Sequence, residues 1–201
     1  MKLLFATRNR GKLKELAQLV APHGFEVVSL DDLSEMAEVI EDAPTFAGNA
    51  EKKARAALAA TGLPSLADDS GLEVDALSGA PGVFSARWAG AVGEAKDAAN
   101  NAKLLASLAE VPDERRTARF RCALAFVDDR GVLLTAEGTC EGTIARTARG
   151  VGGFGYDPLF VVAGTGRAMA ELSADEKNRV SHRGQALRTL VKALASHSGI
   201  T

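Results

Sequence analysis

Hydrophobic positions follow two different periods along the first third of the chain, and the periods alternate. Residues 2–7 form a short apolar run, which is typical of a buried strand. Apolar residues then recur at helical spacing from Leu13 until Pro22, which predicts a helix. Residues 25–30 predict a second strand, whereas residues 31–44 have no clear period.

The next segments continue this alternation of helix and strand. Residues 46–60 are rich in alanine with interspersed cations, and Gly62 and Pro64 follow, so we expect a helix that ends there. Residues 65–67 predict a short strand that ends at Asp68. A second amphipathic helix is expected over residues 94–109.

A strand pair and a final helix complete the pattern. Alternate residues are apolar from Ala118 to Phe126, and the polar turn 128–131 leads into a partner strand over residues 132–145. This pair predicts an antiparallel hairpin, and residues 181–196 predict the last helix. Early helices combined with a long hairpin indicate an α/β protein with a mixed sheet.

Composition restricts the class of protein. The chain has 201 residues, of which 46% are hydrophobic, 25% charged and 5% aromatic, as in ordinary globular proteins. This length predicts one domain, residues 1–201, with room for two lobes. No charge-free stretch of about 18 apolar residues is present, and the first apolar run is too short for a signal peptide. We therefore expect a cytoplasmic protein whose two cysteines, Cys122 and Cys140, are reduced.

Charge is nearly balanced overall but uneven along the chain. The net charge of −2 lacks the basic excess of proteins that bind nucleic acid or anionic membranes. Residues 1–15 carry five Lys or Arg and one acid, whereas residues 26–42 carry seven acids and no base. Two solvated faces would explain this asymmetry. The alternative is a small polyanion held locally, with carboxylates nearby for a metal.

The loop of residues 7–12 lies between the first strand and the first helix. A helix N-terminus offers backbone N–H groups and partial positive charge, and Lys12 adds a full charge, so a phosphate could bind there. The spacing of a Walker A loop is absent. A plain capped turn is the alternative interpretation.

Two acidic pairs could hold a metal ion. Asp68 and Asp69 follow a predicted strand, where α/β proteins commonly place their chemistry, and Glu41 and Asp42 form a second pair. Carboxylates from both would suit Mg²⁺, which is often shared with substrate phosphates. Adjacent acids are also common in ordinary turns.

Glycines at residues 150–155 match the pattern G-x-G-x-x-G but not its usual context. A dinucleotide-binding fingerprint opens a helix, whereas Pro158 follows here and disfavours helix at Asp157. We expect a loop that permits close backbone approach, with Phe154 or Tyr156 available to cover a flat ligand. A structural bulge is the alternative.

Polar residues gather before the last helix. Lys177, His182 and Arg183 could form a cluster for a phosphate or the edge of a purine base. The alternative is helix capping, with Ser181 as an N-cap and Ser173 and Glu176 as a capping box for a short preceding turn. The chain lacks a G-x-S-x-G elbow, and its three histidines lack zinc-ligand spacing.

Taken together and in this order, these segments resemble the inosine/xanthosine triphosphate pyrophosphatase family, which removes non-canonical purine nucleotides. The matching motifs lie at residues 7–12, 45–46, 49–50, 53–54, 67–77, 79–87, 153–160 and 181–187. They fall within residues 2–190, and several long motifs in a fixed order are far more specific than any one of them.

The resemblance implies a fold and an activity. The fold would be an elongated, two-lobed α/β subunit with a central mixed β-sheet flanked by helices, assembled as a homodimer. The activity would be Mg²⁺-dependent hydrolysis of ITP, dITP or XTP to the monophosphate and pyrophosphate. The substrate would be the purine nucleoside triphosphate, with no nucleic-acid or membrane partner.

The resemblance also implies a set of site residues. Phosphates would be held by Thr7, Arg8, Asn9, Arg10, Gly11, Lys12 and Lys53. Glu41 and Asp69 would hold the metal, Asp69 would also accept a proton, and Ser70 would contact the substrate. The nucleoside end would be bound by Phe154, Gly155, Tyr156, Asp157, Lys177, His182 and Arg183.

Three questions stay open at this stage. Members of the family commonly have Glu where this chain has Gly48, which removes a carboxylate from the helix. A metal-bound carboxylate is a poor base, so Asp68 and Asp69 could divide the roles of ligand and base between them. A nucleotide sensor without turnover, or a pyrophosphatase for other triphosphates, would be the competing functions.

Overall fold

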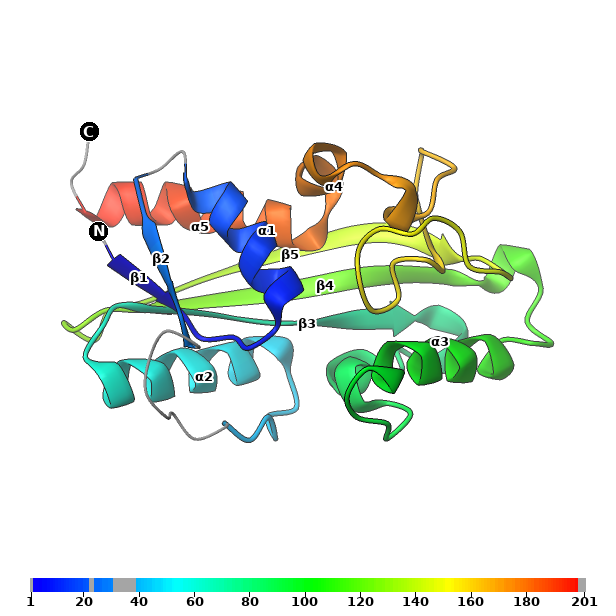
Figure 1. The fold of residues 1–201 in the computed structure, drawn as a ribbon, viewed down its shortest axis with the longest axis horizontal. Helices are drawn as coiled ribbons and strands as arrows, with labels where there is room; N and C mark the ends of the chain where they lie inside the picture. Colours follow the sequence, from blue (N-terminus) through cyan, green and yellow to red (C-terminus); the bar gives the residue numbers. More distant parts are fainter. Residues whose placement is uncertain (1, 22–23, 31–38, 199–201) are drawn as a thin grey trace. The chain divides into compact units, whose positions relative to one another are not determined.

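The computed structural model describes residues 2–21, 24–30 and 39–198, and it contains a sheet of six strands flanked by helices (Figure 1). The strands are β1 (Lys2–Phe5), β2 (Glu26–Ser29), β3 (Ser65–Val74), β4 (Thr117–Val127), β5 (Leu133–Ile144) and β6 (Phe160–Val162). The α-helices are α1 (Arg10–Val20), α2 (Phe46–Thr61), α3 (Ala95–Ser107), α4 (Ala174–Val180) and α5 (His182–Ser198).

The sheet is mixed, as predicted. Its strand order is β2-β1-β3-β4-β5-β6. Strand β1 pairs in parallel with β2 and with β3, whereas β5 and β6 are antiparallel. A tight turn joins β4 to β5, with the N–H of Gly131 donating to the carbonyl of Asp128, so the predicted hairpin is present.

The chain forms two compact units, which correspond to the two expected lobes. The first unit contains Met1–Asp69, Cys122–Gly138 and His182–Thr201, and the second contains Ser70–Arg121 and Thr139–Ser181. Strands β3, β4 and β5 each contribute residues to both units.

Alternation along the strands gives the first unit two apolar faces. Leu3 and Phe5 join Leu66 in a core cluster that includes buried residues of α1 and α5. Leu4, one position along, belongs to the opposite cluster with the buried alanines of α2. Because successive strand residues point to opposite faces, helices cover both sides of these strands (Figure 1). The small side chain of Ala54 at this contact is fully buried.

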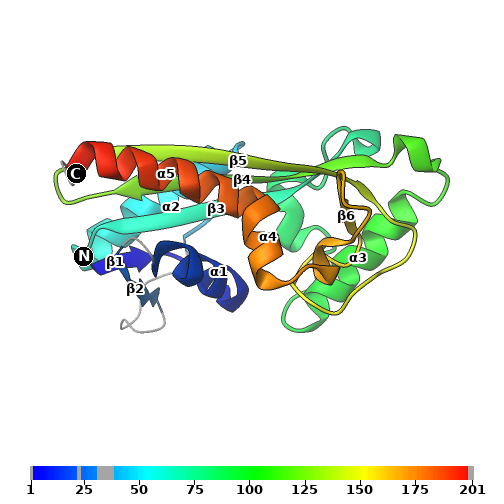
Figure 2. The same cartoon turned by 90° about the horizontal axis from the view of Figure 1, so that it is seen from above.

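The second unit, which contains α3, α4 and β6 (Figure 2), has its own core, to which α3 contributes. Leu104 and Leu108 are fully buried, and the rings of Phe120 and Phe160 lie 4.4 Å apart between centroids. The buried guanidinium of Arg116 donates to the carbonyl of Leu108, at the end of α3. The core thus fixes the position of α3 within this unit.

The structure corrects some predicted boundaries. Strand β3 continues to Val74 instead of ending before Asp68, because β4 lies beside it in the sheet and compensates for the low strand propensity of the Asp and Gly residues. Strand β6 was not predicted. Ser173 and Glu176 do form a capping box, which begins α4, and Ser181 ends that helix immediately before α5.

No helix among the described residues is both long enough and apolar enough to cross a membrane.

Candidate active site

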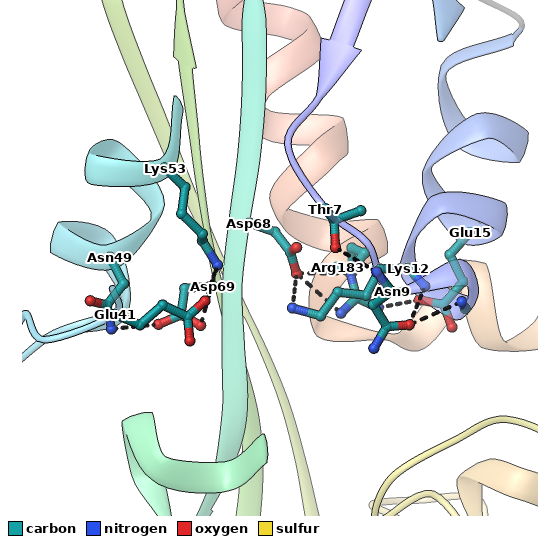
Figure 3. Close-up of polar contacts among 11 residues, drawn as sticks. Thr7, Asn9, Lys12, Glu15, Glu41, Asn49, Lys53, Asp68, Asp69 and Arg183 are labelled. Carbon is teal, nitrogen blue, oxygen red and sulfur yellow. Dashed lines mark hydrogen bonds and ion pairs between the residues drawn. The ribbon is translucent and has the colours of Figure 1, made fainter. Parts of the chain in front are cut away.

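Asp68 and Asp69 lie side by side in β3 but point in opposite directions (Figure 3). Successive residues of an extended strand face opposite sides of the sheet, so the two carboxylates have different surroundings. Both are buried, with Asp68 only 1% and Asp69 only 5% exposed. They follow Leu66, which pairs with Phe5 at the end of β1. Their position is therefore beside the end of β1 and in the interior of β3.

Asp68 belongs to a cluster of four charges, of which Asp68 and Arg183 are buried. Its Oδ2 lies 2.9 Å from Nζ of Lys12 and 3.3 Å from both Nε and Nη2 of Arg183. The remaining guanidinium nitrogen, Nη1, donates to Glu15. Two cations and two anions thus neutralise one another, and the Arg183 side chain is 2% exposed.

These cations determine the protonation state of Asp68. Burial alone would raise its pKa, but the charges of Lys12, Arg183 and Lys53 outweigh burial and hold the pKa well below its usual range. Asp68 is therefore ionised at neutral pH and makes a poor proton acceptor.

Asp69 faces helix α2 instead. Nδ2 of Asn49 donates to its Oδ2 at 2.9 Å, and Nζ of Lys53 lies 3.8 Å from its Oδ1. The same ammonium contacts Oε1 of Glu41 at 2.6 Å. Asn49 and Lys53 are four residues apart in α2, so they lie on one face of the helix.

The pKa of Asp69 shifts in the opposite direction to that of Asp68. Burial raises it, and the nearby charge of Glu41 adds to this effect, against the lowering influence of Lys53 and Asn49. Burial would lower the pKa of Lys53, but the charges of Asp68, Asp69 and Glu41 outweigh burial and raise it, so Lys53 stays an ammonium ion.

The loop of residues 7–12 is a capped turn. Oδ1 of Asn9 accepts the N–H groups of Gly11 at 3.0 Å and Lys12 at 3.2 Å, and Oγ1 of Thr7 accepts the N–H of Asn9 at 3.2 Å. Two of the N–H groups that the sequence interpretation left free for phosphate are thus bonded to the Asn9 cap. Arg8 and Arg10 are exposed. Lys12 connects this loop to the aspartate pair through its ion pair with Asp68.

Glu41 and Asp69 fit a magnesium ion by the chemistry of their donor atoms. Mg²⁺ prefers oxygen ligands and often takes only one or two carboxylates, with water and substrate phosphates completing its shell. These two carboxylates both contact the ammonium of Lys53, within 2.6 Å and 3.8 Å. Over the described ranges, no group of three or more His, Cys, Asp or Glu side chains forms a more complete metal site.

The second unit holds a further group of candidate residues around a turn over residues 154–157. The N–H of Phe154 donates to Oδ2 of Asp157 at 2.9 Å, and Nζ of Lys177 donates to the same oxygen at 2.7 Å. The ammonium of Lys177 lies 4.8 Å from the centroid of the Phe154 ring, which is partly exposed. Phe154 and Lys177 are thus brought together.

Tyr156 does not serve as a cover for a flat ligand. It is 5% exposed, and its hydroxyl donates to the carbonyl of Ser85 at 2.9 Å. The glycines before it permit a close approach between two backbone segments of this protein: the N–H of Gly152 donates to the carbonyl of Ala170 at 3.1 Å. A turn and then β6 come directly after Gly155, where a dinucleotide-binding fingerprint would open a helix, so the rejection of that fingerprint is confirmed.

Comparison with known proteins places this geometry in a family, since the model of the Ham1 family matches residues 3–193. The chain belongs to the Ham1 family. A relative from Desulforamulus reducens, named dITP/XTP pyrophosphatase, is 56% identical over 195 residues, covering 96% of each chain. The predicted resemblance is therefore confirmed.

Two solved structures support the fold of this Ham1 family member. A nucleoside-triphosphatase, dITP/XTP pyrophosphatase, from Mycobacterium abscessus is 52% identical with a TM-score of 0.76, covering 94% of this chain and 98% of that one. A HAM1 protein from Coxiella burnetii is 41% identical with a TM-score of 0.86, covering 98% and 99%.

The remaining predicted residues of this Ham1 chain lie in both units. His182 is buried at the start of α5, in the first unit, whereas Ser70 is half-buried in β3 and begins the second. Lys177 is paired with Asp157 in the second unit and Arg183 with two acids in the first.

Sequence reasoning missed Glu15 and gave no role to Asn49. Glu15 lies three residues after Lys12 in α1, so helical spacing places both on one face, and that spacing is the signal that was available. Asn49 lies in one of the motifs that carry the family resemblance, but the sequence alone does not show that its amide bonds to Asp69. That contact follows from the packing of α2 against β3.

Gly48 is explained by local packing. A Cβ atom there would lie 2.9 Å from Cβ of Ala43 and 3.1 Å from Oγ1 of Thr45, the residue that caps α2. The segment before α2 therefore lies too close to the helix for a side chain at position 48, and a glutamate there would displace it.

Proposed function

We propose that this protein hydrolyses non-canonical purine nucleoside triphosphates, such as dITP, XTP and ITP, to the monophosphate and pyrophosphate. The observation that carries the proposal is the pair of adjacent aspartates with different surroundings, one neutralised by Lys12 and Arg183, the other facing Asn49 and Lys53. The name dITP/XTP pyrophosphatase, given to relatives over 50% identical, supports the same activity.

Binding of the phosphates falls to cations of the first unit. Lys12 and Lys53 are only partly buried, with side chains 15% and 13% exposed, and each is held by a carboxylate. Pairing fixes the ammonium groups in place before a substrate arrives, which lowers the cost of ordering them. The cap on α1 gives the loop of residues 7–12 a defined shape.

Glu41 and Asp69 would hold Mg²⁺. When bound, the ion would draw negative charge from the phosphates and from the leaving pyrophosphate. Lys53 already contacts both carboxylates and reduces their mutual repulsion. Gly48 contributes no carboxylate, so this chain would rely on Glu41 and Asp69.

Asp69 would accept the proton of the attacking water. Its Oδ2 accepts a hydrogen bond from Nδ2 of Asn49 at 2.9 Å, which fixes the orientation of the carboxylate. Burial raises the pKa of Asp69, and a carboxylate with a raised pKa is the better general base provided that it holds the ion through water and not by direct ligation. Asp68, whose pKa is held low, instead keeps Lys12 and Arg183 in place.

Phe154 and Lys177 of the second unit would bind the nucleoside end. The partly exposed ring of Phe154 could stack on a purine, while Asp157 holds Lys177 near that ring. His182, Arg183 and Ser70 keep the roles that the resemblance implies. The homodimer and the cytoplasmic location also remain predictions.

Assay of pyrophosphate release from a panel of triphosphates tests the proposal. We expect release from dITP, ITP and XTP with Mg²⁺ and far less from ATP. Nucleotide binding without pyrophosphate release would indicate a sensor, and preference for a pyrimidine triphosphate would indicate a different pyrophosphatase. Release that persists after exhaustive chelation would contradict the metal site.

A further inference from the structure

Helix α3 holds the 154–157 turn through two polar side chains. Oδ2 of Asp97 accepts the backbone N–H of Gly155 at 2.7 Å, and Nδ2 of Asn101 donates to the backbone carbonyl of Gly155 at 2.9 Å. Residues four apart in a helix lie on one face, so the two side chains grip both backbone groups of one residue. All these residues belong to the second unit.

These two hydrogen bonds act where the backbone of the turn bends. Gly155 has a positive φ of 61°, and its N–H and carbonyl belong to the two peptide groups on either side of its Cα. The first of those peptide groups is shared with Phe154. Fixing it therefore restricts the backbone from which the Phe154 ring extends.

The rest of the turn is fixed by a different set of contacts. The N–H of Phe154 donates to the side chain of Asp157, and the N–H of Asp157 donates back to the carbonyl of Phe154 at 3.3 Å. Lys177 adds an ion pair to Asp157 at 2.7 Å. These contacts close the turn on itself, whereas Asp97 and Asn101 connect Gly155 to α3.

Helix α3 is a firm support for such a connection. Leu104 is fully buried in the core of the unit. Asn100, also buried, accepts the N–H of Ala89 at 2.8 Å and donates to the carbonyl of Ser85 at 3.2 Å. A binding group gains precision when its supporting residues are themselves fixed by packing and hydrogen bonds.

Helix stability alone does not account for both residues. A carboxylate in the first turn of α3, such as Asp97, would stabilise the helix through its dipole without any contact to Gly155. Asn101 lies in the helix interior, where asparagine is a poor helix former. The feature that the two share is their contact with Gly155.

We propose that Asp97 and Asn101 are positioning residues for the nucleoside end of the substrate. They hold the 154–157 turn so that Phe154 and Lys177 are oriented before the nucleotide binds. The inference rests on the proposed function, because it takes the turn to bind the base. Preorganisation of this kind strengthens binding by reducing the ordering that binding requires.

The test compares Asp97→Ala and Asn101→Ala with the wild-type protein in steady-state hydrolysis of dITP. Loss of the bond to the charged Asp97 corresponds to about a tenfold change in affinity and loss of the neutral Asn101 bond to about fivefold, so KM should rise at least about fivefold in each variant. The kcat should stay within about twofold. Inhibition by inorganic tripolyphosphate, which lacks a nucleoside, should be unchanged, because the proposed phosphate-binding residues lie elsewhere.

Two further variants separate positioning from helix stability. Glu94→Gln is the control: it removes an exposed carboxylate at the N-cap of α3. Asp97→Asn likewise removes a carboxylate near the start of this helix, but at the residue that contacts Gly155. The Glu94 variant should keep the wild-type KM. Asp97→Asn retains an acceptor oxygen and should raise KM less than Asp97→Ala, and it replaces that variant if circular dichroism shows that Asp97→Ala is unfolded.

The possible results are distinct. An unchanged KM for dITP in the Asp97 and Asn101 variants would overturn the inference alone, provided that the wild-type protein releases pyrophosphate. Equal weakening of dITP and tripolyphosphate binding, or an equal rise in KM for Glu94→Gln, would overturn it as well. A wild-type protein that releases no pyrophosphate from dITP would overturn the proposed function and this inference together.

Discussion

Replacement of Arg183 by methionine should destabilise the protein strongly. The guanidinium is 2% exposed and bridges two carboxylates, those of Asp68 and Glu15, with Asp68 itself 1% exposed. Removing one member of a buried ion pair leaves an uncompensated charge and typically costs about 3–5 kcal/mol. Methionine restores much of the lost volume, so charge, and not a cavity, dominates the expected loss.

That loss is large relative to ordinary stability. Natural domains are stable by only about 5–15 kcal/mol, and in a chain of this size each kcal/mol shifts the melting temperature by about 2–4 °C. We therefore expect Arg183→Met to lower the melting temperature by about 10 °C. Urea unfolding followed by circular dichroism should show a lower midpoint with an unchanged slope.

Two controls make the experiment specific. Arg188→Met changes an exposed arginine of the same helix and should alter stability by less than about 0.5 kcal/mol. Glu15→Gln added to Arg183→Met restores the neutrality of the cluster and should recover part of the loss. An Arg183→Met protein within 1 kcal/mol of wild type, or a double variant no more stable than the single one, would refute the electrostatic reasoning.

Kinetics of the same variant separate two roles for Arg183. If the guanidinium also donates to the 6-oxo group of the base, the ratio of kcat/KM for ITP over ATP should narrow, mainly through loss of ITP hydrolysis. If it only holds Asp68 and Lys12, both substrates should slow equally. Guanine also has a 6-oxo group, so Arg183 alone could not reject GTP.

Three other changes probe the site and the core. Asp69→Asn should lower kcat by at least ~10² without loss of circular dichroism, and near-normal turnover would remove Asp69 from the mechanism. Lys12→Ala should chiefly raise KM for dITP, whereas unchanged KM and kcat would leave residues 7–12 as a capped turn alone. Burial raises the pKa of Cys122 to about 12 and that of Cys140 to about 11, from 9.0. The unfolded chain therefore releases these protons first, so the free energy of unfolding should fall as pH rises above about 9. A Cys122→Ala, Cys140→Ala protein should show a shallower fall between pH 9 and 11, and equal slopes would contradict the shifts.

Much of the fold could be predicted because the strongest periodic signals were also the correct ones. Helices α1, α2, α3 and α5 each bury one face, and their periods are visible in the sequence. Strand β6 has three residues, too few for a period. Helix α4 was visible only through its capping box.

The site was predicted less completely, and the reason lies in β3. The Asp and Gly residues at positions 68–71 are typical of a turn, so the predicted strand ends before the aspartates, whereas the observed strand continues to Val74. The neighbouring strand β4 keeps this segment extended despite its composition. In a strand that continues through residues 68 and 69, alternation of side chains places Asp68 and Asp69 on opposite faces of the sheet. The question of which acid is the base then has a structural basis.

The extended backbone of β3 therefore lets two adjacent carboxylates have different pKa values. Two adjacent carboxylates in a turn could face the same solvent and share the same cations, which would leave their pKa values similar. In β3 the two side chains point in opposite directions, so Lys12 and Arg183 lower the pKa of Asp68, whereas burial raises that of Asp69. A strand that passes between α2 on one side and α1 with α5 on the other can thus give two neighbouring, chemically identical residues different roles.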